Sequence, residues 1–191
     1  MNGISIKTAK AILDEYHSPG HAVLELRTRF HKNPIPIPET VIAFSPVQEI
    51  LILKKLFEYR KKDKPCLVFA PTINQCENLF QKLNLLAKSG FFIHSKAENR
   101  EQILSDFKKG KYKYLVTTSV LERGVTVKNL QVLVYHADEK RVYDSSTLIQ
   151  IAGRAGRKMD APSGEVIFYG EKGTNEMADA IKEIEFCNNF L

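Results

Sequence analysis

Short, continuous apolar runs alternate with stretches of helical periodicity along most of this chain. The apolar runs, which predict buried strands, cover residues 41–44, 66–70, 91–94, 114–117, 131–136 and 165–169. Apolar positions three or four residues apart predict helices over residues 46–62, 72–89, 99–108 and from 146 to beyond 153. Strands that alternate with helices form parallel sheets with both faces covered. We therefore expect an α/β fold with a doubly wound, mostly parallel sheet, which binds its ligands at the carboxyl ends of the strands.

The first 40 residues follow a different pattern. Pro34, Pro36 and Pro38 alternate with other residues, and proline can neither continue a helix nor occupy a central strand. Such a stretch is extended and semi-rigid. We interpret residues 1–40 as a connector with the tail of a preceding region, and residues 41–191 as one globular domain.

The composition is that of an ordinary soluble globular protein. Of the 191 residues, 43% are hydrophobic and 26% are charged, and every apolar run ends before the roughly 18 residues that a membrane span requires. The first ten residues do not form a secretory signal, so we expect a cytoplasmic protein.

The cysteines and the net charge indicate which kinds of site and partner to expect. The three cysteines are an odd number and form no CxxC pair, which argues against a disulfide framework and a zinc site, so no metal site is predicted. The net charge of +6 and the pI near 9.1 favour a polyanionic partner, because lysine and arginine neutralise phosphates.

The segment QIAGRAGR, residues 150–157, carries the most chemical information. On a continuing helix, at 100° per residue, Gln150, Arg154 and Arg157 lie on one stripe, and two planar guanidiniums suit a phosphate chain. Gly153 and Gly156 remove side chains that would hold another surface away. The alternative is a solvated basic helix face, which the two glycines disfavour because each costs about 1 kcal/mol relative to alanine inside a helix.

This segment resembles motif VI (QxxGRxGR) of superfamily-two helicases, whose arginines reach across a cleft between two RecA-like lobes to the γ-phosphate of ATP. The resemblance implies that Arg157 is the arginine finger, that Arg154 is its phosphate-binding companion and that Gln150 contributes to nucleotide binding. Such a finger stabilises charge on the transferring phosphoryl group.

A second block, LVTTSVLERGVT at residues 115–126, resembles motif V of the same helicases. The resemblance implies that Thr117 and Thr118 contact the nucleic-acid backbone and that Glu122, Arg123 and Gly124 lie near the nucleotide. Considered alone, the two threonines are as consistent with an ordinary helix cap. Many relatives carry an acidic residue at the position of Thr126, so a ribose contact there is not expected.

Two further segments fit the same scheme. LVFAPT, residues 67–72, resembles motif IV, and His94-Ser95 with Arg100 and Phe107 resembles the stretch between motifs IV and V. The resemblance implies that Pro71, Thr72 and Ser95 position backbone phosphates in the nucleic-acid groove. For His94 itself we expect a structural role at a strand end.

The sequence has no phosphate-binding loop of the form G-x-x-x-x-G-K-[ST]. Asp138-Glu139, which follows an apolar strand, is interpreted as a loop and not as a magnesium site. A helicase resemblance without these parts implies that ATP and Mg²⁺ are held mainly by another lobe, and that this chain alone is catalytically inactive.

The proline-rich connector resembles that of one family within the superfamily-two helicases. RFHKNPIPIP, residues 29–38, together with TTSVLERGVT, resembles the ComFA family of late competence proteins, bacterial ATPases that help to pull single-stranded DNA into the cytoplasm during natural transformation. The resemblance covers essentially the whole chain. It implies a second RecA-like lobe, an interlobe connector at residues 1–40, a missing first lobe, and partners that include single-stranded DNA, ComFC and an uptake channel at the inner face of the membrane.

Three alternatives remain. One is the second lobe of a replication-restart or branch-migration helicase of the PriA or RecG kind. Another is a non-catalytic single-strand binder, which needs exposed aromatic platforms, for which Tyr59, Tyr112 and Tyr143 are the candidates. A dinucleotide-dependent reductase is disfavoured because the sequence has no G-x-G-x-x-G after its first strand.

Overall fold

The computed structural model describes residues 33–94, 97, 99–118, 127–158, 161 and 163–189. Six strands lie within these residues: β1 (Glu39–Ile42), β2 (Cys66–Ala70), β3 (Gly90–Ile93), β4 (Tyr114–Thr118), β5 (Gln131–Val134) and β6 (Val166–Gly170). Five helices accompany them: α2 (Ser45–Lys61), α3 (Ile73–Leu86), α4 (Arg100–Lys108), α5 (Ser145–Ala152) and α6 (Asn175–Asn188).

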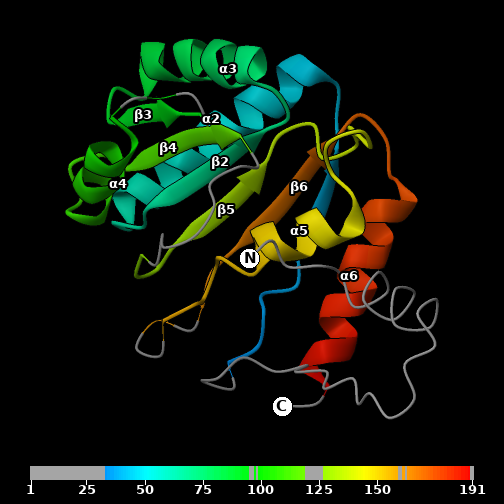
Figure 1. The fold of residues 1–191 in the computed structure, drawn as a ribbon. Helices are drawn as coiled ribbons and strands as arrows, with labels where there is room; N and C mark the ends of the chain where they lie inside the picture. The colour runs from blue at the N-terminus through cyan, green and yellow to red at the C-terminus, as the bar shows by residue number, and fades with distance from the viewer. Residues whose placement is uncertain are drawn as a thin grey trace, which may run out of the picture.

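The six strands form one sheet in the order β1-β6-β5-β2-β4-β3, and every neighbouring pair is parallel (Figure 1). The predicted α/β fold with a doubly wound parallel sheet is therefore confirmed. Each predicted strand exists, with ends that differ from the prediction by no more than two residues. At the carboxyl end of the fifth, the ladder stops at Val134, and residues 135–138 form a turn.

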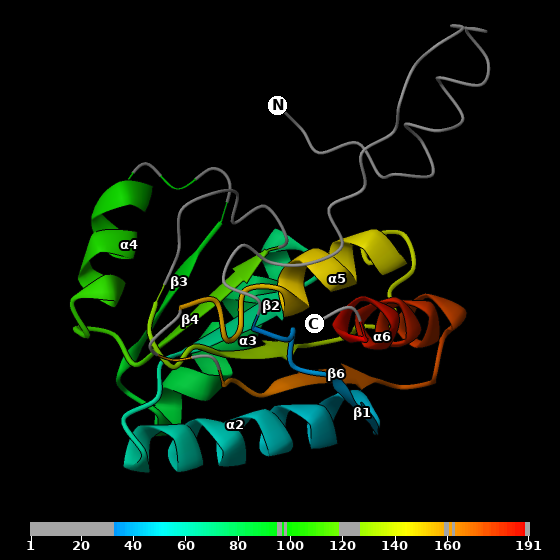
Figure 2. The same cartoon turned by 90° about the horizontal axis from the view of Figure 1, so that it is seen from below.

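Alternation along the central strand β2 divides the core into two layers. Leu67 and Phe69 pack on one face with α4, α5 and α6, whereas Cys66, Val68 and Ala70 pack on the other face with α2 and α3. Figure 2 shows α2 on one side of the sheet and α4 and α5 on the other. Both faces of β2 are buried along its whole length, as expected for a central parallel strand.

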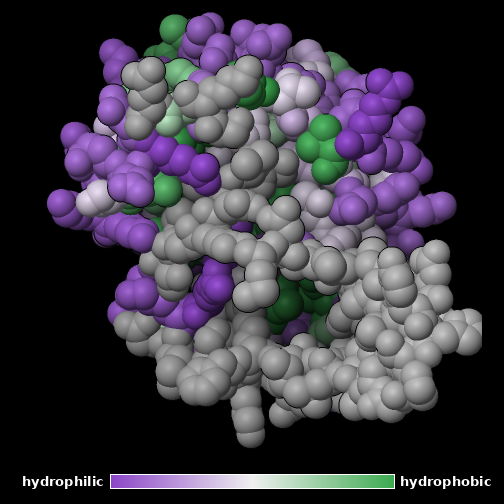
Figure 3. Space-filling view, in the orientation of Figure 1, coloured by the Kyte–Doolittle hydropathy of each residue, from purple (hydrophilic) through white to green (hydrophobic). Residues whose placement is uncertain are grey.

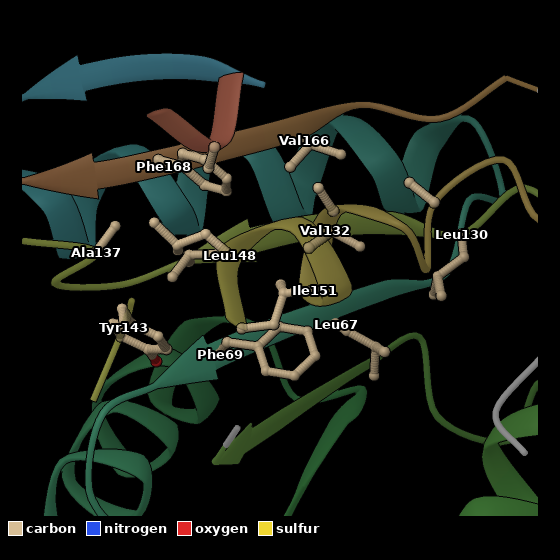
Figure 4. Close-up of a cluster of buried hydrophobic side chains, with 14 of the residues drawn as sticks. Leu67, Phe69, Leu130, Val132, Ala137, Tyr143, Leu148, Ile151, Val166 and Phe168 are labelled. Atoms are coloured by element: carbon tan, nitrogen blue, oxygen red, sulfur yellow. The ribbon is translucent and has the colours of Figure 1, made fainter. Parts of the chain in front are cut away.

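Helix α5 is shorter than predicted. Asp144 caps its first turn by accepting a hydrogen bond from the backbone N–H of Thr147 at 2.7 Å. The helix ends at Ala152, and residues 153–156 form turns. The prediction that the helix runs on through Arg157 was wrong, because Gly156 takes a φ of 59°, which is incompatible with a right-handed helix. Figure 4 shows Leu148 and Ile151 of α5 pointing into the core beside Phe69.

Helix α6 was not predicted, and it carries an unexpected contact with the proline-rich segment. Residues 33–38 form neither helix nor strand, as the alternating prolines predict. The backbone N–H of Ile35 donates to Asn188 Oδ1 at 2.9 Å, and Asn188 Nδ2 donates to the Ile35 carbonyl at 2.8 Å. This reciprocal pair fixes the segment against the end of α6 across 153 residues of sequence.

Among the described residues, no helix is long and apolar enough to cross a membrane.

Candidate nucleotide and nucleic-acid interface

The arginines of the QIAGRAGR segment lie on the turn that follows α5. The backbone N–H of Arg154 donates to the Ile151 carbonyl at 3.1 Å, which forms a turn directly after the helix. Gly156, with a φ of 59°, then leaves the right-handed helical conformation. Arg154 is partly buried and Arg157 is exposed. Gln150 is exposed on the last turn of α5, so the three side chains share a neighbourhood but not the helical stripe on which the sequence argument placed them.

Burial and like charge act together on this turn. Burial lowers the pKa of the Arg154 guanidinium, and the positive charge of Arg157 lowers it further. Two cations on one short turn favour an anionic ligand.

Gly164 packs against the turn of residues 153–157, which we call the arginine turn. This role of Gly164 was not predicted from the sequence. A Cβ at this position would lie 2.8 Å from the Leu130 carbonyl oxygen, 2.9 Å from Ala155 Cβ and 3.1 Å from the Gly156 nitrogen. Only glycine permits the arginine turn to pack this closely on the segment that enters β5. The Ser-Gly pair just before β6 is an ordinary turn signal, so the sequence offered no means of recognising the contact.

These contacts place the arginine turn at the amino ends of the strands, because Leu130 precedes β5 and Gly164 precedes β6. Helix α5 starts beyond the carboxyl end of β5 and runs back along the sheet (Figure 1). The expectation that ligands gather at the carboxyl ends of the strands therefore does not extend to Arg154 and Arg157.

Four predicted nucleic-acid residues, Pro71, Thr72, Thr117 and Thr118, lie at the opposite, carboxyl ends of the strands. Thr72 follows β2 and is exposed, and its Oγ1 accepts a hydrogen bond from the backbone N–H of Gln75 at 3.2 Å as the N-cap of α3. Pro71, beside it, is buried. Thr72 thus has a structural role in the helix start whether or not it also contacts phosphate.

Thr117 and Thr118 end β4 beside the end of β2, with Thr117 opposite Phe69 and Thr118 opposite Ala70. Both are buried, with exposed fractions of 1% and 5%. Thr117 Oγ1 donates to the Thr118 carbonyl at 3.2 Å, so its hydroxyl is directed into the fold. Thr118 is the more accessible of the two by this measure.

Four predicted site residues, Ser95, Glu122, Arg123 and Gly124, lie outside the described residues, as does Thr126. His94, which was expected to be structural, has its Nε2 at 3.6 Å from Glu77 Oε1 and its ring 6.0 Å from that of Phe92. Asp138 and Glu139 lie in the loop after β5, as interpreted from the sequence. Within the described ranges, no group of three or more His, Cys, Asp or Glu side chains could hold a metal ion.

Two of the three candidate stacking tyrosines belong to the core. Tyr59 is 2% exposed and Tyr143 is fully buried, so the hypothesis that these rings form an exposed platform was wrong. Tyr112 is partly exposed on the loop before β4.

The match to known families resolves the class of protein. The helicase conserved C-terminal domain matches residues 48–159, which is more than half of the chain and contains the arginine turn. The chain belongs to the helicase conserved C-terminal domain family. Its fold is RecA-like and superposes on that of yeast Dbp5 bound to RNA and ADP BeF3 with a TM-score of 0.69, at 17% identity over 100% of this chain and 48% of that one.

Among named relatives, this helicase lobe is similar to the competence protein ComFA. It is 36% identical to the protein of Streptococcus pneumoniae over 86% of this chain and 40% of the relative, and 30% identical to that of Bacillus subtilis over 94% and 39%. The similarity is that of a ComFA carboxyl-terminal lobe. The chain thus spans about 40% of the length of these curated relatives.

Proposed function

We propose that this helicase lobe is the second half of an ATP-dependent single-stranded DNA translocase that acts in DNA uptake during natural competence. The observation that carries the proposal is the separation of the two candidate groups. Arg154 and Arg157 lie at the amino ends of the strands, and Thr72 and Thr118 lie at the carboxyl ends. One rigid sheet joins them, so a movement driven at one end is transmitted to the other.

At the nucleotide end, the first lobe holds ATP and Mg²⁺, and this lobe supplies the arginine turn. Arg157 is exposed and extends toward the γ-phosphate, where it stabilises the charge that develops during phosphoryl transfer. Arg154 is partly buried, which limits its freedom and fixes a second positive charge beside the first. Gln150, exposed on the preceding turn, orients the phosphate chain or the attacking water.

At the nucleic-acid end, phosphates of the strand meet the start of α3 and the end of β4. The first backbone N–H groups of a helix and its dipole favour an anion, and α3 has no acidic residue in its first turn. Closing and opening of the two lobes during hydrolysis then moves the strand. The similarity to ComFA supports DNA uptake as the setting, with ComFC and a membrane channel as partners at the inner face of the membrane.

The test is steady-state ATPase of this chain with and without single-stranded DNA, repeated after addition of a separately made first lobe. We expect no turnover by the chain alone and DNA-stimulated turnover by the pair. In the two-lobe protein, Arg157→Ala should lower kcat about 10³-fold or more while DNA affinity stays within about twofold.

Lys158→Ala is the matched control, because Lys158 is the next exposed cation along the chain. It should leave kcat unchanged. Turnover by the chain alone would contradict the half-motor proposal, and an Arg157→Ala protein with most of its ATPase would contradict the finger.

A further inference from the structure

The outer edge of the sheet carries a group of aromatic rings that the proposed function does not use. β3 is the last strand of the sheet, and within the described residues it pairs only with β4, so no described strand lies along its other edge (Figure 1). β3 reads Gly90-Phe91-Phe92-Ile93, and the two phenylalanines are partly exposed. An open strand edge beside large apolar rings needs a physical explanation.

The rings of Phe91 and Phe92 lie close together although the two residues are neighbours on one strand. Neighbouring residues of a strand direct their side chains to opposite faces. The centroids of these two rings are nevertheless only 5.8 Å apart and their planes differ by 17°. Since β4 occupies one side of β3, the two rings can approach each other only around the free side.

Other rings extend the pair in both directions. Tyr112 stacks on Phe91 from the loop before β4, and Phe80 of α3 packs against Phe92 on the opposite face. The centroid distances are 5.1 Å for Tyr112 and Phe91, 5.0 Å for Phe80 and Phe92, and 6.0 Å for Phe92 and His94. We call Phe80, Phe91, Phe92 and Tyr112 the aromatic edge. All four side chains are partly exposed.

Exposed lysines lie near the aromatic edge in the sequence. Lys88 stands two residues before β3, Lys108 ends α4, and Lys109 and Lys111 lie on the loop that leads to Tyr112. Lys111 Nζ lies 5.5 Å from the Tyr112 ring centroid and also pairs with Asp106 at 2.8 Å. Figure 3 shows hydrophilic surface over this side of the molecule, interrupted by small hydrophobic patches. Aromatic faces interleaved with cations are the composition of single-strand binding surfaces.

We infer that the aromatic edge and its lysines form a second contact surface for single-stranded DNA, continuous with the proposed DNA contacts at the start of α3 and the end of β4, which we call the groove. The inference rests on the proposed function, which brings DNA to Thr72 at the start of α3 and to Thr118 at the end of β4, the strand that pairs with β3. From there the edge leads along β3 toward Tyr112. A four-residue strand spans about 13 Å, which corresponds to about four stacked nucleotides at roughly 3.4 Å each.

Binding of oligonucleotides of two lengths to the 191-residue chain tests this surface. An oligonucleotide of about six nucleotides fills the groove alone, whereas one of about twenty also reaches the edge. The unmodified chain should bind the longer one more tightly. The double variant Lys108→Glu, Lys109→Glu and the single variant Tyr112→Leu should each weaken binding of the longer oligonucleotide about tenfold. Neither should change binding of the shorter one by more than about twofold.

Two controls separate stacking and local charge from other effects. Tyr112→Phe keeps the ring and should bind like the unmodified chain. Lys172→Glu combined with Lys182→Glu makes the same change in net charge on exposed lysines beyond β6 and should have little effect on the difference between lengths.

The rival role for the rings is to cover the strand edge against pairing with another chain. If the edge variants bind the longer oligonucleotide as the controls do, that role is sufficient and the second surface is refuted, while the groove remains. If the unmodified chain binds neither length, the DNA groove of the proposed function fails, and the edge surface fails with it.

Discussion

At the scale of single residues, the glycine that supports the arginine turn matters as much as the arginines. Gly164 leaves 2.8 Å between its missing Cβ and the Leu130 carbonyl oxygen, which is a fixed backbone atom. Gly164→Ala should therefore push the turn away or strain the entry to β5. We expect a loss of about 1–3 kcal/mol in the free energy of unfolding, and in the two-lobe protein a fall in kcat that exceeds any change in KM for ATP.

Gly173 supplies the matched control, because nothing lies within 4 Å of the Cβ that alanine would add there. Gly173→Ala should change Tm and kcat little. Equal effects of the two substitutions, measured by thermal unfolding and steady-state ATPase, would show that the close packing at Gly164 is unimportant.

The sequence predicts a role for the arginines from their spacing and residue types. It did not predict that Arg154 would be partly buried and Arg157 exposed, since this difference is set by tertiary contacts of the turn. Nor did it predict that Thr117 would be directed inward, because the register of β4 against β2 decides which face each threonine meets. The residue types of the candidate site can be read from the sequence, whereas the exposure and orientation of their side chains depend on residues far along the chain.

At the scale of elements, periodicity predicted all six strands and four of the five described helices. α5 ends early because the glycines permit a turn that also packs on Gly164. α6 was missed although Thr174 caps it, with its Oγ1 accepting from the Met177 N–H at 3.2 Å. Its buried face is sparse, with Met177, Ala180 and Ile184 as the fully buried side chains, and so gives a weak apolar pattern.

The pair between α6 and the proline-rich segment gives a prediction at this scale. Asn188 makes one accepting and one donating hydrogen bond with the backbone of Ile35. Asn188→Leu removes both and leaves two backbone groups without these partners, so we expect a loss of about 1–3 kcal/mol in the free energy of unfolding. Asn188→Asp can still accept from the Ile35 N–H and should lose less.

Asn189→Ala is the control, since Asn189 is exposed at the end of the same helix. Urea unfolding of the three variants, with amide exchange at Ile35, measures both stability and local opening. An Asn188→Leu protein with unchanged stability and unchanged exchange at Ile35 would rule out the pair as a stabilising contact.

At the scale of the whole molecule, buried cysteine and tyrosine side chains predict that the folded state loses stability at alkaline pH. Burial raises the pKa of Cys76 from 9.0 to about 12 and that of Tyr135 from 10.0 to about 12. Burial also raises the pKa of Tyr114 and Tyr143 above 10.0. In the unfolded chain these groups lose their protons near their ordinary values, so the folded state binds more protons above pH 9.

The free energy of unfolding therefore decreases as the pH rises. The contribution to stability is complete below the unfolded pKa values and is lost as pH rises through about 9 to 12. Urea midpoints measured across this range should fall progressively, and Cys76→Ala should reduce the earliest part of the fall. A midpoint that stays constant to the top of the range would contradict the burial of these groups.

The doubly wound architecture was predictable at this scale because strand and helix alternate. The strand order was not, since the position of β2 between β5 and β4 depends on which crossovers pack best. That order is what brings the ends of β2 and β4 together and sets the arginine turn at the other end of the sheet.

The pair between Ile35 and Asn188 also determines how the lobe would bear mechanical load. β1 is a four-residue edge strand that pairs with β6 alone among the described strands, and a strand paired on one side peels away easily when it is pulled. Force that arrives along the proline-rich segment meets Asn188 before it reaches β1. The tension therefore passes into α6, whose buried side chains spread it over the core, so that the load on the edge of the sheet is reduced.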